Sequence, residues 1–223
     1  MTAPDMVCVA WDIETCPQPL SALTDTQKER YETEMRQSER KKPDLDHEDR
    51  CRLVRSTHPL LGWICCISAV SGTLDGQVND PVSWTAATED DEVDLFLDFW
   101  STVAGFSRGV TWVTFNGKRF DVPFLLARSA RRDVSPTRRD LTDTYPYNNR
   151  PHTDLCNLWP ASYSLADLCE HLYVDSPKDG FDGSKVADAV EEGRIEQMQE
   201  YCERDVVATL KCAQAARAVL RLD

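Results

Sequence analysis

An acidic pair interrupts the first apolar segment of this chain. Met6 to Ile13 has the composition of a buried strand, yet it contains Asp12, and Glu14 follows directly after it. Side chains two residues apart on a strand point to the same face, so both carboxylates point the same way. Unpaired carboxylates in a core repel each other and lose hydration, whereas Mg²⁺ or Mn²⁺ binds oxygen ligands and reverses that penalty. The pair predicts a metal site, unless the two acids only cap a turn at a frayed strand end.

The size and composition of the chain limit its class. Its 223 residues suit a single domain spanning positions 1–223. No apolar run approaches the roughly 20 residues needed to cross a bilayer, and positions 1–5 lack the features of a signal sequence. The nine cysteines are odd in number and contain no Cys-x-x-Cys pair, which favours small buried side chains over disulfides or zinc. We expect a soluble cytoplasmic protein with no membrane association.

A charged segment follows the first strand. Positions 17–59 are rich in charge and poor in periodic apolar residues, with nine acidic and nine basic residues between Thr24 and His58. Such a segment can bury little surface, so we expect an exposed, helical insertion. It is either a surface elaboration or an arm that guides substrate.

The remaining pattern predicts an α/β sandwich. Further strands are expected at 63–70, 78–85 and 110–115, and helices at 93–103, 122–132, 164–173, 184–192 and 195–222. The stretch between 133 and 151 contains several Pro and Asn residues and is expected to be irregular. These elements predict a mixed five-stranded sheet with helices on both faces.

Two further carboxylates complete a set that suits metal chemistry. Asp121 stands at the start of the helix after the 110–115 strand, and Tyr201 and Asp205 are four residues apart on the last helix, so they share one face. Two divalent ions about 3.5 to 4 Å apart can activate water and hold both the attacking and the leaving oxygen of a phosphodiester. The tyrosine hydroxyl can orient the water. The set therefore predicts two-metal hydrolysis of a phosphodiester.

The order of these residues resembles the three motifs of the DEDD superfamily of 3'-5' exonucleases. The chain is most similar to the predicted exonucleases related to the proofreading domain of B-family DNA polymerases. The matching residues are Asp12-Ile13-Glu14, Asn116 with Phe120-Asp121, and Tyr201 to Asp205. The resemblance implies a ribonuclease H-like fold, two Mg²⁺ or Mn²⁺ ions held by the four acids, and a catalytic set of those acids with Tyr201. A tyrosine four residues before the last aspartate implies the tyrosine subclass, DEDDy.

Substrate contacts are expected around the second motif. The resemblance implies that Ile13 and Asn116 contact the substrate, although Asn116 could simply close a turn. Phe120 is a candidate for base stacking, with core packing as the alternative. Lys118 and Arg119 are candidate phosphate contacts. Asp154 and Asp182 are expected to be ordinary caps.

The charge distribution suggests where a polyanion could bind. The net charge is −13, but positions 118–139 contain seven basic and two acidic residues, a local +5. The basic residues are Lys118, Arg119, Arg128, Arg131, Arg132, Arg138 and Arg139. Clustered basic residues attract phosphates even on an acidic protein, so this cluster is a predicted docking surface, with a solvated helix face as the alternative.

The leading hypothesis is a metal-dependent exonuclease that removes nucleoside 5'-monophosphates from the 3' end of single-stranded DNA. One alternative is an RNA-trimming 3'-5' exoribonuclease with the same site, because the metal ligands cannot distinguish the two sugars. The other is a non-catalytic module that binds nucleic acid.

Overall fold

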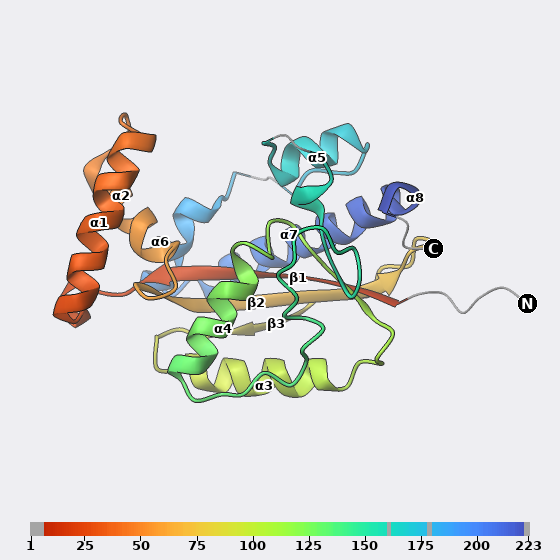
Figure 1. Cartoon of the computed structure of the whole chain (residues 1–223), viewed down its shortest axis with the longest axis horizontal. Helices are drawn as coiled ribbons and strands as arrows, with labels where there is room; N and C mark the ends of the chain where they lie inside the picture. Colours follow the sequence, from red (N-terminus) through yellow and green to blue (C-terminus); the bar gives the residue numbers. More distant parts are fainter. Residues whose placement is uncertain (1–6, 160–161, 178–179, 221–223) are drawn as a thin grey trace, which may run out of the picture.

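The sheet at the centre of the fold contains both antiparallel and parallel strand pairs (Figure 1). The computed structural model describes residues 7–159, 162–177 and 180–220. Its strands are β1 (Val7–Pro17), β2 (Gly62–Thr73), β3 (Val82–Thr85), β4 (Thr111–Thr114) and β5 (His152–Asp154), in the order β3-β2-β1-β4-β5. β1, β2 and β3 form an antiparallel meander, whereas β4 and β5 run parallel to β1. The predicted mixed five-stranded sheet is confirmed.

The alternation of side chains along β1 separates two cores. Val9, Trp11 and Ile13 belong to one hydrophobic cluster, whereas Cys8 and Ala10 belong to the cluster on the other face. Because side chains alternate along a strand, Asp12 and Glu14 share the face of Cys8 and Ala10. The acidic pair therefore continues an apolar face.

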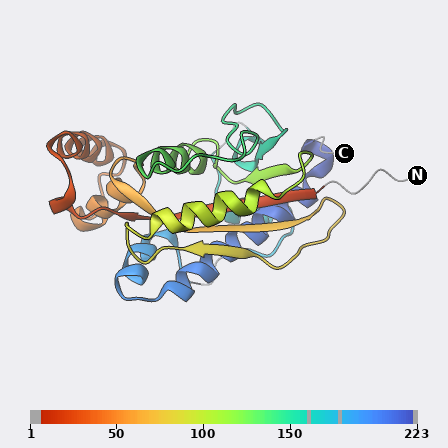
Figure 2. The same ribbon diagram turned by 90° about the horizontal axis from the view of Figure 1, so that it is seen from below.

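Helices cover both faces of the sheet (Figures 1 and 2). α3 (Glu92–Ala104) and α4 (Asp121–Arg131) pack on the face of Trp11, and α7 (Ile195–Ala215) runs along the opposite face. The shorter helices are α5 (Leu165–His171), α6 (Val186–Glu191) and α8 (Arg217–Leu220), with 3-10 turns η2 (Leu155–Asn157) and η3 (Gly183–Lys185). α5 packs on α7, so residues after β5 lie on the α7 side. None of the described helices has the length and apolar character needed to cross a membrane.

A buried carboxylate ties α4 to α3 and the sheet. Glu92 is fully buried and accepts hydrogen bonds from Ile64 N (2.8 Å), Arg128 Nη2 (2.6 Å) and Arg132 Nε (3.0 Å). Arg128 also pairs with Glu89 at 2.7 Å. A buried ion can be tolerated only when it is paired and hydrogen-bonded, and this network meets that condition.

This network corrects the predicted basic docking surface. Arg128, Arg132, Arg138 and Lys118 all face carboxylates of the protein, and the side chains of Arg128 and Lys118 are fully buried. Their partners are Glu89, Glu92, Asp140 and Asp143, which lie outside positions 118–139. The local +5 is therefore largely neutralised inside the fold. Of the seven basic residues, Arg119, Arg131 and Arg139 are exposed.

The charged segment after β1 contains η1 (Leu20–Ala22), α1 (Asp25–Lys41) and α2 (His47–Ser56). α1 and α2 lie side by side at one end of the sheet around a small cluster of Leu23, Met35, Val54 and Leu61 (Figure 1). Arg50 is buried at the α1–α2 junction, where its guanidinium donates to the backbone carbonyls of Lys42, Pro43 and Leu45. That positions 1–223 form one domain with an insertion at 17–59 stays a prediction.

Two elements differ from the sequence prediction. β5 lies just after the segment expected to be irregular, and its three residues pair with β4. The last helix was expected to reach position 222, but α7 ends at Ala215 and α8 begins at Arg217; positions 221–223 lie outside the described residues. β5 is too short and too polar for periodicity to reveal it.

Candidate active site

The site lies where β1 extends beyond β4. β4 pairs with β1 only at Cys8, Val9 and Ala10. Beyond that point one edge of β1 has no strand partner among the described residues, and the Ile13 amide instead donates a hydrogen bond of 3.1 Å to Oδ1 of Asp121. Asp121 is the first residue of α4 and is 2% exposed. The end of one strand thus places a helix-borne carboxylate beside the acidic pair.

Asp12 and Glu14 converge with a cysteine of α7. One ligand atom from each of Asp12, Glu14 and Cys202 lies within 4.8 Å of the others. The thiol Sγ of Cys202 is 3.9 Å from Oδ2 of Asp12 and 3.8 Å from its backbone oxygen. The sequence predicted only that Cys202 is a small buried side chain, and its burial is confirmed. One feature of the sequence indicates that Cys202 lies near the acidic pair: it adjoins Tyr201 and precedes Asp205 by about one helical turn.

The carboxyl groups shift one another's pKa values. Burial is the main cause that raises the pKa of Asp12 well above its ordinary value, and Asp121, Glu14 and Asp205 add to it. Burial followed by Asp205 raises the pKa of Glu14 in the same way. Burial also raises the pKa of Asp121, although hydrogen bonds from Asp12 and the Ile13 amide oppose that rise. Four acids therefore share one electrostatic site.

Tyr201 faces this acidic site from α7. Burial raises the pKa of its hydroxyl, and the carboxylates of Glu14, Asp205 and Asp12 raise it further. Its hydroxyl thus stays protonated at neutral pH. The ring packs against Phe181 with centroids 5.2 Å apart, which holds the side chain in place.

The donor set fits divalent cations. Hard cations such as Mg²⁺ and Mn²⁺ prefer carboxylate oxygens, and a group of mutually repelling acids gains most from their charge. Cys202 adds a sulfur that is less suited to them, and burial, the Cys66 thiol and the nearby carboxylates all raise its pKa, so it stays a neutral thiol. The possible acidic metal-binding group is therefore the Asp12 and Glu14 pair with its neighbours.

Residues 58–212 match the model of a family described as predicted 3'-5' exonucleases related to the exonuclease domain of PolB. The match contains Asp121, Tyr201 and Asp205. The chain belongs to this exonuclease family. Asp12 and Glu14 precede the matched residues, so only the geometry above places them beside Asp121. No curated protein matches the chain.

Two solved structures share the fold of this chain. The family B DNA polymerase from the hyperthermophilic archaeon Pyrobaculum calidifontis matches with a TM-score of 0.60 and 20% identity over 96% of this chain and 25% of the polymerase. Exonuclease I of E. coli in complex with a dA16 oligonucleotide matches with a TM-score of 0.50 and 12% identity over 96% of this chain and 41% of its own. This exonuclease-family chain thus spans well under half of either protein. Its fold is ribonuclease H-like.

A clamped turn leads from β4 to Asp121. Asp154, at the end of β5, accepts hydrogen bonds from the amides of Asn116 (2.7 Å), Lys118 (3.1 Å) and Cys156 (3.0 Å). Asn116 has a φ of 65°, a left-handed conformation that Asn tolerates better than most residues. Asp154 therefore fixes the turn and caps η2, and Asp182 caps η3, which confirms both expected caps.

The residues predicted to contact substrate differ in whether their side chains are accessible. Phe120 packs on Phe124 and lines a cavity with Glu14, whereas Arg119 is exposed. Lys118 was expected to contact phosphate, but its buried ammonium donates to Asp143 and to backbone carbonyls, so it is not positioned to do so. Ile13 is 3% exposed and faces the opposite core, so its side chain is likewise unavailable to substrate.

Proposed function

We propose that the protein is a metal-dependent 3'-5' exonuclease of the tyrosine subclass that acts on single-stranded DNA and releases nucleoside 5'-monophosphates. One observation carries the proposal: carboxylates from β1, α4 and α7 meet at one point beside a protonated tyrosine. Membership of the exonuclease family supports it.

The four acids have different parts in this proposal. Asp12, Glu14, Asp121 and Asp205 would hold two Mg²⁺ or Mn²⁺ ions. When bound, the ions supply positive charge that lowers the pKa of an attacking water and neutralises the phosphate. Asp121 also fixes the end of β1 through the Ile13 amide. The Tyr201 hydroxyl positions the attacking water through a hydrogen bond, and its high pKa keeps its proton in place.

A cavity beside Glu14 suits the terminal nucleotide. It has a volume of about 350 Å³, and its lining includes Glu14, Phe120, Leu53 and the hydroxyl groups of Thr57 and Ser184. An aromatic ring and an apolar side chain can contact a base, and the hydroxyls can hydrogen-bond its edge or the sugar. α2 supplies Leu53 and the residue after α2 is Thr57, so the insertion forms part of this wall.

A panel of substrates tests the proposal. Single-stranded DNA, duplex DNA and RNA of one sequence, each labelled at the 5' end, are incubated with the protein in Mg²⁺ or in EDTA. We expect Mg²⁺-dependent shortening that is fastest on single-stranded DNA. Faster shortening of RNA would identify an exoribonuclease instead, and binding without shortening would identify a non-catalytic module.

A further inference from the structure

A second cavity lies on the other side of the turn that precedes Asp121. Its volume is about 750 Å³, and its lining includes Asn116, Arg119, Tyr147, Trp159 and Tyr163. It is roughly twice as large as the cavity beside Glu14, with its volume of about 350 Å³. The acidic site and its cavity use none of these residues, so this cavity is a separate feature of the surface.

The lining of this cavity has an unusual charge for an acidic protein. It contains no Asp or Glu among the described residues, whereas each of the four other cavities that we compared includes at least one. Arg119 is exposed. Burial is the main cause that raises the pKa of Cys156 in the same lining, the nearby Asp154 carboxylate raises it further, and the guanidinium of Arg119 opposes that rise. Arg119 is thus the one charged residue of the described lining, and its guanidinium can contact a phosphate.

Aromatic rings form the walls. Tyr147 is 83% exposed and Trp159 36% exposed, although large rings usually bury their surface. Trp159 is held between Tyr163 and His171, with ring centroids 5.6 and 5.3 Å away, and the Tyr163 hydroxyl donates to the Leu155 carbonyl at 2.6 Å. Trp159 is therefore a fixed platform, which lowers the entropy cost of stacking a ligand on it.

The lining also contains an unused hydrogen-bond donor. Nδ2 of Asn157 is buried and has no hydrogen-bond partner within the described part of the chain. Buried polar groups normally have a partner, so this amide needs one.

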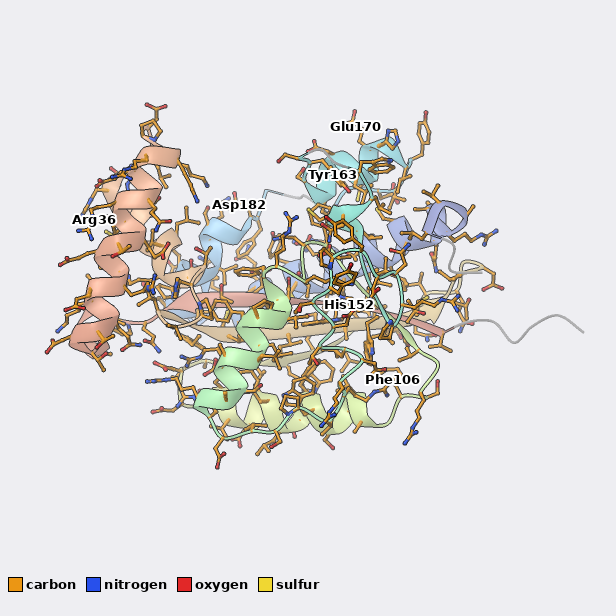
Figure 3. The ribbon with its side chains drawn as sticks, in the orientation of Figure 1. Arg36, Phe106, His152, Tyr163, Glu170 and Asp182 are labelled. Atoms are coloured by element: carbon orange, nitrogen blue, oxygen red, sulfur yellow. The ribbon has the colours of Figure 1, made fainter. Side chains whose placement is uncertain are left out.

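The turn from Asn116 to Asp121 connects the two cavities. Asn116 and Arg119 line the larger one, and Phe120 lines the one beside Glu14. Figure 3 shows Tyr163 and Asp182 on opposite sides of the start of α4, and Asp182 adjoins Gly183 and Ser184 of the smaller cavity. A strand lying across this turn therefore reaches both cavities, because residues of the turn line each of them.

We propose that the larger cavity binds single-stranded nucleic acid on the 5' side of the bond to be cleaved. Bases stack on Trp159 and Tyr147, Arg119 contacts a phosphate, and the 3'-terminal nucleotide occupies the smaller cavity. Aromatic rings beside an arginine match the chemistry of single-strand recognition, and the volume leaves room for more than one nucleotide. This inference rests on the proposed function, because that function sets the direction of the strand.

Binding measured against strand length tests the proposal without requiring turnover. Asp12→Asn protein in EDTA is titrated with thymidine 5'-monophosphate, which fits the smaller cavity alone, and with a thymidine octanucleotide, and then with the uridine equivalents, which distinguish DNA from RNA. Trp159→Ala is compared with Tyr173→Ala, which removes a tyrosine that is 98% exposed but outside the lining. Stacking contributes about 1–3 kcal/mol per base, so Trp159→Ala should weaken octanucleotide binding roughly 5- to 150-fold.

The pattern across variants decides the outcome. We expect Trp159→Ala to weaken octanucleotide binding far more than mononucleotide binding. Trp159→Phe should keep most of the octanucleotide affinity, and Tyr173→Ala should change neither affinity. An unchanged octanucleotide affinity in Trp159→Ala, or an equal loss for both lengths, would overturn the proposal. If the wild-type protein cleaves strands but Trp159→Ala binds them normally, the subsite is wrong and the proposed function stands. Length-dependent binding by a protein that cleaves nothing would contradict the proposed function and leave the binding cavity supported.

Discussion

Asp121 accepts a hydrogen bond of 3.1 Å from the backbone amide of Ile13, which lies 108 positions earlier in the chain. The bond joins the first residue of α4 to the free edge of β1 between Asp12 and Glu14. One carboxylate thus satisfies a strand amide and contributes negative charge to the site.

Substitutions at Asp121 should separate these two roles. Asp121→Asn keeps an oxygen that can accept from Ile13, so it should fold normally but lose Mg²⁺-dependent cleavage. Asp121→Ala should also lose cleavage, and it should be less stable than Asp121→Asn by about 1–3 kcal/mol because the Ile13 amide loses its partner. Urea unfolding and strand cleavage measure the two effects. Wild-type cleavage by Asp121→Asn would contradict the role of its charge.

The acidic site should make the metal-free protein less stable as pH rises. The pKa values of Asp12, Glu14 and Asp121 are raised in the folded state, so that state binds more protons than the unfolded chain. Their stabilising contribution to the free energy of unfolding is therefore fully present below the unfolded-state pKa of about 4. It is lost as pH rises through their pKa values in the folded state. Asp12→Asn should raise the neutral-pH Tm in EDTA and flatten this dependence, and Mn²⁺ should raise the wild-type Tm more at higher pH. An identical pH dependence of Tm for the two proteins would contradict this account.

The hydroxyl of Tyr201 should matter for turnover and hardly for metal binding. Tyr201→Phe keeps the ring contact with Phe181 but removes the hydroxyl that we propose orients the attacking water. We expect cleavage to slow by about 10²-fold with little change in Mn²⁺ affinity. Tyr31→Phe, in the insertion, is the matched control. A Tyr201→Phe protein with the wild-type rate would show that the residue only packs.

The buried arginine of α4 should support stability rather than DNA binding. Arg128→Met leaves Glu92 buried with one partner fewer, so we expect a loss of about 3–5 kcal/mol in the free energy of unfolding. Arg131→Gln, whose side chain is 55% exposed, should change stability by less than about 0.5 kcal/mol. Equal destabilisation by both substitutions would argue against the network around Glu92.

Exposed arginines should differ in their effect on the salt dependence of binding. If Arg119 contacts one phosphate, Arg119→Gln should reduce the slope of log affinity against log salt by about 0.7 on a single strand. Arg131→Gln should leave the slope unchanged, because Arg131 lies beside Glu89 and outside the larger cavity. Affinities of an Asp12→Asn protein across a salt series provide the measurement. A larger reduction of the slope by Arg131→Gln than by Arg119→Gln would place the docking surface on α4 instead.

The sequence predicted the parts of the fold that periodicity controls. The β1 pattern, the helical spacing of α3 and the four-residue spacing of Tyr201 and Asp205 each depend on neighbouring residues, and the structure contains all three elements. The mixed five-stranded sheet also agrees with the prediction. These features follow from local geometry.

The features that the sequence could not predict depend on contacts between distant residues. Arg128 and Lys118 looked like surface charges because their partners, Glu92 and Asp143, lie outside the segment in which charge was counted. Cys202 approaches Asp12 only because α7 crosses β1. Trp159 and Tyr147 lie 12 positions apart, with β5 and η2 between them, and the fold of these two elements brings them to one cavity. Local patterns contain no information about such pairs.

The release of label from the two ends of one strand tests the central claim most directly. A single-stranded oligonucleotide labelled at the 5' end or the 3' end is incubated with wild-type protein and Mg²⁺, with Asp12→Asn as the control. The account predicts that the 3' label is released at once as a nucleoside 5'-monophosphate, that the 5' label forms a ladder of shortening strands, and that Asp12→Asn does neither. Release of the 5' label first, or equal cleavage by Asp12→Asn, would contradict it.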